Sequence, residues 1–339
     1  MNPSLPLFAA AGALMAASPA MATDAPIAPK VLVISMFKHE ATHWLEREKL
    51  DTKTPIAGLS EAFPDLSCNA AGLCLVTTAM GYANAASSIS ALVHSDKLDL
   101  SHTYFLIAGI AGVDPADGTT GSALWARYAI DGGLQWEVDA RSLPEGWNTG
   151  LFGMYSKAPG EKPKSLYGTE IYHLDDALVD KAYALSKDVA LADSDDARAY
   201  RALYPAAPAN AAPTVSICDT VSGDTWWHGK AMSDAIDAWA KLLTDGAANY
   251  CTTQQEDNAT LTALKRGADM GRLDFKRIAV LRTASNFDQE HPGQLPSDSL
   301  NANSGGFMPS LENAYRVGSA LTGAIIADWD VWKDGVPKD

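Results

Sequence analysis

Positive charge is scarce in this sequence. The chain has 26 Lys and Arg residues against 41 Asp and Glu residues, so its formal net charge is −15 at pH 7. Nucleic acids and anionic membranes attract proteins through an excess of positive charge, and this chain has the opposite excess. The balance argues against both as partners, whereas it does not restrict the binding of a small neutral ligand.

Long apolar runs are also missing. Beyond the N-terminal segment no stretch approaches about 18 consecutive apolar residues, so no later part of the chain is expected to cross a membrane. Residues 1–22 are apolar and rich in Ala, and they end in Ala20-Met21-Ala22, which is typical of a signal peptide. No Lys or Arg precedes Lys30, which departs from that pattern. We expect a periplasmic or secreted protein.

Cysteine is rare too, with four residues in the whole chain. An even number of cysteines in an exported protein permits two disulfides. Cys68–Cys74 would close a short loop, and Cys218–Cys251 would join two segments predicted to be neighbouring strands. Four buried thiols are the alternative.

Short apolar runs recur along the chain and predict buried strands of an α/β fold. The predicted strands are Val31–Ser35, Leu73–Thr78, Tyr104–Ala108, Val215–Cys218, Tyr250–Thr253 and Ile278–Leu281. Leu124–Ile130 and Leu134–Val138 predict a hairpin across Asp131-Gly132-Gly133. Residues 142–213 are less regular, with one helical stretch around Asp176–Ala192, and we interpret them as an insertion within a single domain, 23–339.

Polar residues and glycines follow these strands at their carboxyl ends. In open α/β sheets this edge is where ligands bind, so we expect one site there. Each place also has a simpler interpretation, as a tight turn, a helix cap or a solvated loop. The candidate positions are Glu40, Gly109–Gly112, Ser222–Trp226, Glu256 and Arg282–Asp288.

One of these positions lies in a metal-binding pattern, His39-Glu40-Ala41-Thr42-His43. Two His residues four apart share a helix face and can bind zinc, with the intervening Glu as a general base. A third ligand is hard to find, since no metzincin-type continuation follows and Glu61 is only a possible candidate. A zinc peptidase is therefore a third-choice hypothesis, and we expect no metal.

Several motifs resemble the nucleoside phosphorylase and nucleosidase superfamily. Arg282-Thr283-Ala284-Ser285-Asn286 resembles its Arg-x-x-Ser-Asp signature, with Asn in place of Asp. Ser222-Gly223-Asp224 with Trp226 resembles its Ser-Gly-Asp and aromatic segment, and Gln255-Glu256 its Met-Glu pair. The Gly109–Gly112 segment is similar to its glycine turn.

The pattern is most similar to the purine nucleoside permease family. Met36-Phe37 with Glu40-Ala41, the Gly109–Val113 segment and the Glu256-Asp257 pair carry this resemblance. It implies a three-layer α/β/α domain with a mixed, partly barrel-like central sheet. It also implies a purine nucleoside as the ligand, no cofactor and a homo-oligomer as an open alternative.

The superfamily pattern implies cleavage of the N-glycosidic bond, with roles for individual residues. Glu40 would be the general base, Glu256 would hold the sugar, and Trp226 would stack on the base. Asn286 would bond the departing purine, with Asp288 as a substitute proton donor. Further substrate contacts are implied for Gly109, Ile110, Asp224, Gln255 and Phe287.

The resemblance leaves two questions open. The places where phosphorylases hold phosphate read Met36-Phe37-Lys38, Ile107 and Ile110, and burying an unpaired dianion there would be costly. Water is the expected nucleophile, with phosphorolysis as the alternative. Asn286 cannot deliver a proton, so a nucleoside-binding or transport-accessory protein without turnover is a second hypothesis.

Overall fold

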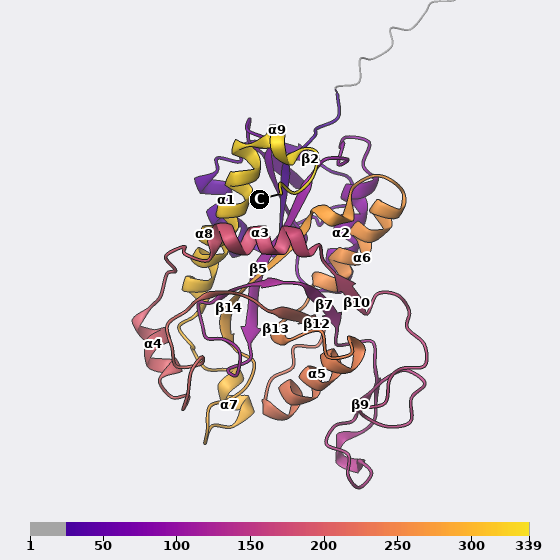
Figure 1. The fold of residues 1–339 in the computed structure, drawn as a ribbon, viewed down its shortest axis with the longest axis vertical. Coiled ribbons are helices and arrows are strands. Elements are labelled where there is room, and N and C mark those ends of the chain that lie inside the picture. Colours follow the sequence, from indigo (N-terminus) through magenta and orange to yellow (C-terminus); the bar gives the residue numbers. More distant parts are fainter. Residues whose placement is uncertain (1–24, 339) are drawn as a thin grey trace, which may run out of the picture.

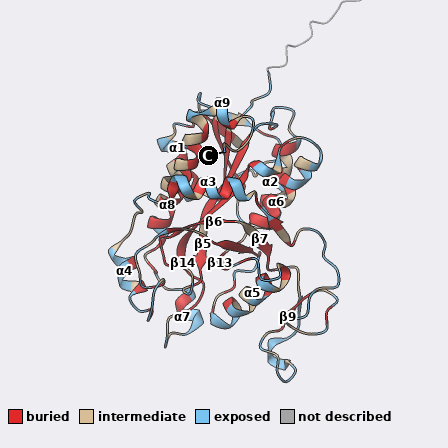
Figure 2. Cartoon of the chain, viewed as in Figure 1, coloured by how far each residue is buried: buried red, intermediate tan, exposed pale blue. Residues whose placement is uncertain are grey.

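Strands β1 (Val31–Ser35), β5 (Tyr104–Val113) and β14 (Ile278–Phe287) form the centre of the molecule. The computed structural model describes residues 25–338 (Figure 1). All five residues of β1 are buried, as are most residues of β5 and β14, and the red core in Figure 2 follows these strands. Apolar, β-branched runs explain this, because parallel strands between two helical layers need apolar side chains on both faces.

Twelve strands of the described chain join in one mixed sheet. The order β10-β7-β12-β13-β5-β1-β4-β3-β2 is continued by β14, which pairs with β5 and β6, and by β11, which pairs with β6. The remaining members are β2 (Thr52–Pro55), β3 (Asp65–Cys68), β4 (Leu73–Thr77), β6 (Ala123–Ala126), β7 (Tyr128–Asp131), β10 (Ile171–His173), β11 (Val215–Ile217), β12 (Asp219–Ser222) and β13 (Tyr250–Gln254).

Part of this sheet curls toward a barrel. Strand β5 pairs with β13 on one side and β14 on the other; β13 leads through β12 to β7, and β14 leads to β6. Only Arg127 separates β6 from β7, so the pairings return to β5. The expected mixed and partly barrel-like sheet is confirmed.

Helices cover the sheet on two sides. Helix α8 contacts α1, and α2 contacts α6; in Figure 1 these two pairs lie on opposite sides of β5. The helices are α1 (Lys38–Arg47), α2 (Tyr82–His94), α3 (Asp176–Ser186), α4 (Asp195–Arg201), α5 (Lys230–Leu243), α6 (Asp257–Asp269), α7 (Pro296–Leu300), α8 (Phe307–Ala327) and α9 (Trp329–Trp332). Short 3-10 turns occupy Ala140–Ser142 and Phe275–Arg277.

Three local expectations were wrong. Gly109–Gly112 is not a turn after the strand, because β5 continues to Val113 and pairs there with β13 and β14. Likewise Arg282–Phe287 is not a loop but the second half of β14. The hairpin is absent from the described chain: β7 ends at Asp131, and β8 (Trp136–Glu137) pairs with β9 (Leu151–Phe152) instead.

Residues 142–213 are divided between the body of the molecule and a projection. Strand β10 pairs with β7 at the end of the main sheet, and α3 packs against α8. The segment around β9 projects from the body in Figure 1. The expected helical stretch ends at Ser186, earlier than Ala192.

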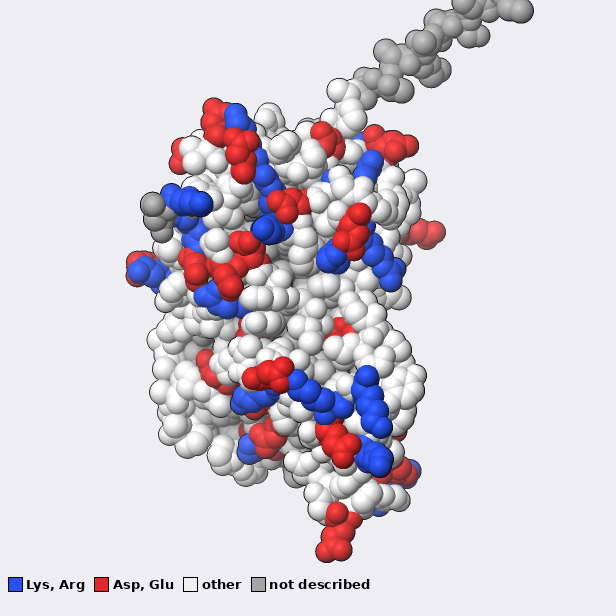
Figure 3. All heavy atoms as spheres, turned by 45° about the vertical axis from the view of Figure 1, so that its right-hand side comes forward, with Lys and Arg blue, Asp and Glu red and all other residues white. Residues whose placement is uncertain are grey.

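Both expected cysteine pairs are disulfides, with Cα–Cα distances of 4.1 Å for Cys68–Cys74 and 5.8 Å for Cys218–Cys251. The second joins the segment after β11 to β13. The predicted signal peptide, 1–22, lies outside the described residues. Within the described residues, none of the helices is apolar over a length that would cross a membrane. On the face shown in Figure 3, basic and acidic side chains alternate and form no continuous basic patch.

Candidate functional site

A cavity of about 450 Å³ opens at the carboxyl ends of the central strands. Its walls come from the segments after β1, β12 and β13, from the second halves of β5 and β14, and from the region between α7 and α8. Because these strands are parallel or closely paired, residues far apart in the sequence meet at this edge. The lining includes Met36, Glu40, Ile110, Gly112, Trp226, Gln255, Glu256, Arg282, Ser285, Asn286, Ser304 and Phe307.

Glu40 is held by two backbone amides in the first turn of α1. Met36 N–H donates to Oε2 at 2.7 Å, and Ile110 N–H donates to Oε1 at 2.8 Å. The side chain is 5% exposed, and burial raises the pKa of Glu40 to about 7 despite the opposing influence of Arg282. A carboxyl group with this pKa exchanges a proton near neutral pH, as a general base must.

Gly109 makes this arrangement possible. A Cβ atom at Gly109 would lie 2.7 Å from Glu40 Oε1, 2.6 Å from Arg282 Nη1 and 2.1 Å from Met36 Cε. Any side chain would therefore displace all three groups. Gly109 itself does not line the cavity, although its neighbour Ile110 does.

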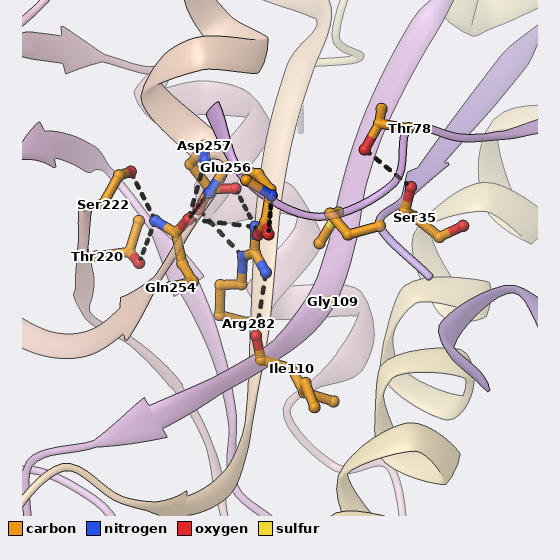
Figure 4. A network of polar contacts seen from close by, with 12 residues as sticks. Ser35, Thr78, Gly109, Ile110, Thr220, Ser222, Gln254, Glu256, Asp257 and Arg282 are labelled. Atoms are coloured by element: carbon orange, nitrogen blue, oxygen red, sulfur yellow. Dashed lines mark hydrogen bonds and ion pairs between the residues drawn. The ribbon is translucent and has the colours of Figure 1, made fainter. Parts of the chain in front are cut away.

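Arg282 lines the cavity and lies within a network of acceptors, which Figure 4 shows. Its Nε and Nη2 donate to both carboxylate oxygens of Asp257, at 3.1 and 2.5 Å. Nη1 donates to Ile110 O at 3.0 Å, and Nη2 lies 3.4 Å from Glu256 Oε2. The guanidinium group is 1% exposed, so these contacts are shielded from bulk water.

Glu256 occupies the cap position of α6 and lines the cavity. Gly81 N–H donates to its Oε1 at 3.1 Å, and Arg282 approaches its Oε2. Burial raises the pKa of Glu256, and Arg282 opposes that rise. The carboxyl group is fixed on one side and faces the cavity, as a group that binds sugar hydroxyls would be.

Asn286 also lines the cavity, beside Ser285. Its Oδ1 accepts a hydrogen bond from Ser285 Oγ at 2.8 Å, and its Nδ2 donates to Phe287 O at 2.8 Å. One N–H of the amide is left over for a ligand. Asn286 can thus donate a hydrogen bond but has no acidic proton to transfer.

Besides Gly109, the predicted site residues Asp288 and Phe287 also lie outside this lining. The Asp288 carboxylate accepts hydrogen bonds from Tyr250 Oη at 2.5 Å and from Ser233 Oγ at 2.8 Å, in the buried space under α5. The Phe287 ring is buried against Tyr204, with ring centroids 4.1 Å apart. Neither side chain is placed where the sequence interpretation required a substrate contact.

The two adjacent tryptophans have opposite environments. Trp226 lines the cavity and is 59% exposed, whereas Trp227 is 6% exposed and packs with Ile236 and Trp239. Gln255 lines the same cavity and donates from Nε2 to Asp224 O at 2.7 Å. Asp224 faces a neighbouring cavity of about 690 Å³, and its Oδ1 accepts from the Tyr82 amide.

The metal-binding pattern is not assembled as a site. Glu40 faces the cavity, whereas the His39 ring lies against Phe37 and Phe307. His43 Nε2 is 3.7 Å from Glu312. Among the described residues, the one cluster with metal-ligand spacing is Asp117, Cys218 and Cys251, and its two cysteines form a disulfide. The zinc peptidase hypothesis therefore loses its geometric basis.

Comparison with known proteins agrees with this geometry. The family described as purine nucleoside permease matches residues 28–337. The chain belongs to the purine nucleoside permease family. A Schizosaccharomyces pombe relative whose name places it in the same family is 37% identical over 345 residues, covering 97% of this chain and 99% of the relative.

Solved structures show the fold of this family member in other proteins. A 5′-methylthioadenosine/S-adenosylhomocysteine nucleosidase from Neisseria meningitidis, in complex with methylthio-immucillin-A, has a TM-score of 0.51 and 15% identity over 88% of this chain and 99% of its own. A Helicobacter pylori nucleosidase with one Asp replaced by Asn, and 5′-methylthioadenosine in its active site, has a TM-score of 0.52 and 14% identity over 87% and 99% of the two chains.

The sequence alone does not predict one part of the cavity wall in this member of the purine nucleoside permease family. Phe307 begins α8 and contributes to the wall, as do Ser299, Leu300, Ala302, Asn303 and Ser304 before it. The Gly305-Gly306 pair before Phe307 signals only a chain reversal. Asp257 belongs to a sequence motif, but the sequence predicts Arg282 in a loop and therefore gives no sign of the buried contact between the two.

Proposed function

We propose that this chain binds purine nucleosides in the 450 Å³ cavity and hydrolyses their N-glycosidic bond. The observation that carries the proposal is that Glu40 and Glu256 line one cavity together with Trp226 and Asn286. This set provides a general base, an acceptor for sugar hydroxyls, a stacking surface and a hydrogen-bond donor for the purine. Relatives named purine nucleoside permease and structural neighbours that are nucleosidases support a purine nucleoside as ligand.

In the proposed reaction Glu40 accepts a proton from a water molecule as the water oxygen bonds to C1′ of the sugar. The C1′–N bond breaks, and its electron pair passes to the purine. Asn286 donates a hydrogen bond to the purine as negative charge develops there, and solvent supplies the proton that completes the free base. Glu256 holds the sugar hydroxyls as the ring flattens toward an oxocarbenium ion.

Water suits this cavity better than phosphate. Two carboxyl groups, Glu40 and Glu256, face it, and like charges repel an incoming dianion. Ile110 adds apolar surface to the wall, whereas Ile107 is wholly buried in the core and takes no part. Hydrolysis to free base and free sugar is the favoured outcome, with phosphorolysis as the alternative product pattern.

Nucleoside binding without turnover is the second candidate. Asn286 favours it, because an amide cannot act as a general acid. The Helicobacter pylori nucleosidase carrying an Asp-to-Asn substitution, with 5′-methylthioadenosine in its active site, supports the same idea. In that case the protein would capture nucleosides for a transporter.

One incubation separates these functions. Purified protein is mixed with inosine or adenosine, with and without phosphate, and free base and sugar products are quantified. Free base with free ribose under both conditions supports hydrolysis. Tight nucleoside binding without any base release contradicts it and supports the binding protein. We place this activity outside the cytoplasm, an assignment that the two disulfides support.

A further inference from the structure

Among the described residues that line the cavity, Arg282 is the sole Lys or Arg. An anionic co-substrate such as phosphate needs positive charge in the wall, because an unpaired dianion in a dry cavity is strongly disfavoured. The state of this one guanidinium group therefore decides whether the cavity accepts an anion.

Asp257 forms an ion pair with Arg282 from the side that does not face the cavity. Its carboxylate receives two hydrogen bonds in the fork geometry, from Nε to Oδ2 at 3.1 Å and from Nη2 to Oδ1 at 2.5 Å. Asp257 is fully buried and does not belong to the cavity wall. Its own backbone N–H donates to Gln254 Oε1 at 2.9 Å, which fixes the start of α6 against the end of β13.

The other donors of Arg282 are also directed to protein atoms. Nη1 donates to Ile110 O at 3.0 Å, and Nη2 lies 3.4 Å from both Glu256 Oε2 and Gln254 Oε1. Three carboxyl groups, those of Asp257, Glu256 and Glu40, surround one guanidinium group. The positive charge of Arg282 is therefore compensated by these carboxyl groups, and none is left to attract an entering anion.

We propose that Asp257 is a specificity-determining positioning residue, which holds the Arg282 guanidinium so that the cavity admits water and rejects phosphate. Asp257 acts through Arg282 and does not touch the substrate. This inference rests on the proposed hydrolysis and deepens it, because it assigns the choice of nucleophile to one buried ion pair. Without this carboxylate, Nε and Nη2 are released and the net charge of the cluster rises by one.

The test compares Asp257→Asn with Asp269→Asn. Asp269 lies on the same helix, is exposed and pairs with Lys265, so its substitution makes the same change in net charge far from the cavity. Binding of inorganic phosphate is measured by calorimetry, and products from inosine plus phosphate are analysed. We expect at least about tenfold tighter phosphate binding in Asp257→Asn, with ribose 1-phosphate among its products, and no change in Asp269→Asn.

Breaking a buried ion pair is destabilising, so a second variant is included. Asp257→Ser leaves room for a water molecule and undergoes the same measurements if circular dichroism shows that Asp257→Asn is unfolded. Equal phosphate affinity in the folded variant and in Asp269→Asn overturns the proposal. Phosphate binding in the cavity of the wild type, or ribose 1-phosphate among its products, overturns it as well. If the wild type cleaves no nucleoside, the proposed hydrolysis fails, and the phosphate titration still decides the role of Asp257.

Discussion

The Oε1 atom of Glu40 and the backbone nitrogen of Ile110 lie 2.8 Å apart, which joins the start of α1 to the middle of β5. With Met36 N–H on its other oxygen, the carboxyl group has a fixed orientation that does not depend on a ligand. A base that is oriented in advance needs no rearrangement when the substrate arrives. Because β5 carries Ile110 and β1 carries the chain into α1, the core of the sheet itself positions this group.

Glu40→Gln should abolish hydrolysis and retain nucleoside binding. The amide keeps the shape of the side chain but cannot accept a proton from water. One of the two backbone amides also loses its acceptor, so we expect a loss of about 1–3 kcal/mol in the free energy of unfolding. Calorimetric nucleoside binding, product analysis and chemical denaturation measure the three effects. Unchanged turnover would exclude Glu40 as the base.

The pH dependence of kcat/KM should show a rising limb near pH 7. Burial raises the pKa of Glu40 to about 7, so the group is protonated and inactive as a base below that value and becomes competent above it. Arg282 stays charged throughout this range, and the pKa of the neighbouring Glu256 is also raised, so the apparent pKa belongs to the two carboxyl groups together. Initial rates with inosine between pH 5 and about 9 measure the limb. A profile that stays flat through pH 7 contradicts this assignment.

Apolar runs such as Val31–Ser35 made the central strands predictable, because their short length and β-branched residues favour a buried strand over a helix. The position of the site was also predictable, because ligands of open α/β sheets bind at the carboxyl ends of the strands. The lengths of β5 and β14 were not predictable in this way. Gly109 and Arg282 are typical of turns and exposed loops. Tertiary contacts explain both inside buried strands, because Arg282 pairs with Asp257 and Gly109 leaves room for Arg282, Glu40 and Met36.

The directions in which the Asn286 and Asp288 side chains point could not be predicted from the sequence either. Asn286 and Asp288 are two residues apart, and a regular strand would place both on one face. The strand ends at Phe287, however, and the register of β14 against β5 shifts between Ala284 and Asn286. Asn286 therefore lines the cavity, whereas Asp288 bonds to Tyr250 and Ser233. Sequence spacing carries no information about such a shift.

Asn286→Asp should raise turnover. The new carboxyl oxygen nearest Phe287 O would lie about where Nδ2 now donates at 2.8 Å, and the repulsion between two acceptors favours the protonated acid. A positioned general acid contributes about 10²–10⁴-fold in rate, so we expect a gain of about 10²-fold or more in kcat for inosine. Asn286→Ala is the control and should lower turnover. A folded Asn286→Asp variant with unchanged kcat would show that base departure is not limited by proton donation.

Trp226→Ala should lower nucleoside affinity, whereas Trp227→Ala should lower the stability of the fold. Trp226 is exposed at the cavity, so its loss should weaken nucleoside binding by about 1–3 kcal/mol and leave stability unchanged. Trp227 is packed in the core, so its loss should reduce the free energy of unfolding by about 3–5 kcal/mol. Nucleoside titration and denaturant unfolding of both variants measure the two quantities. Equal losses of affinity in variants that remain folded would argue against stacking on Trp226.

Asp288→Asn should change the pH dependence of stability. Burial, and then the nearby Asp114, raises the pKa of Asp288 from 3.8 to about 7 in the folded protein. Between these two values the folded state holds a proton that the unfolded state releases, so the contribution of Asp288 to stability is full below about pH 4 and falls as the pH rises through 7. The amide does not titrate, and the variant escapes this loss.

Relative to the wild type, Asp288→Asn should therefore gain about 2–4 kcal/mol in the free energy of unfolding between about pH 5 and 8, since each pKa unit is worth about 1.4 kcal/mol. Denaturant unfolding at a series of pH values measures the difference. Glu40 contributes a loss in the same direction, but it is present in both proteins and cancels in the comparison. The exposed Asp51 serves as the control, and Asp51→Asn should follow the wild type at every pH. A constant difference between Asp288→Asn and the wild type across this range would show that Asp288 is ionised in the folded protein at pH 5.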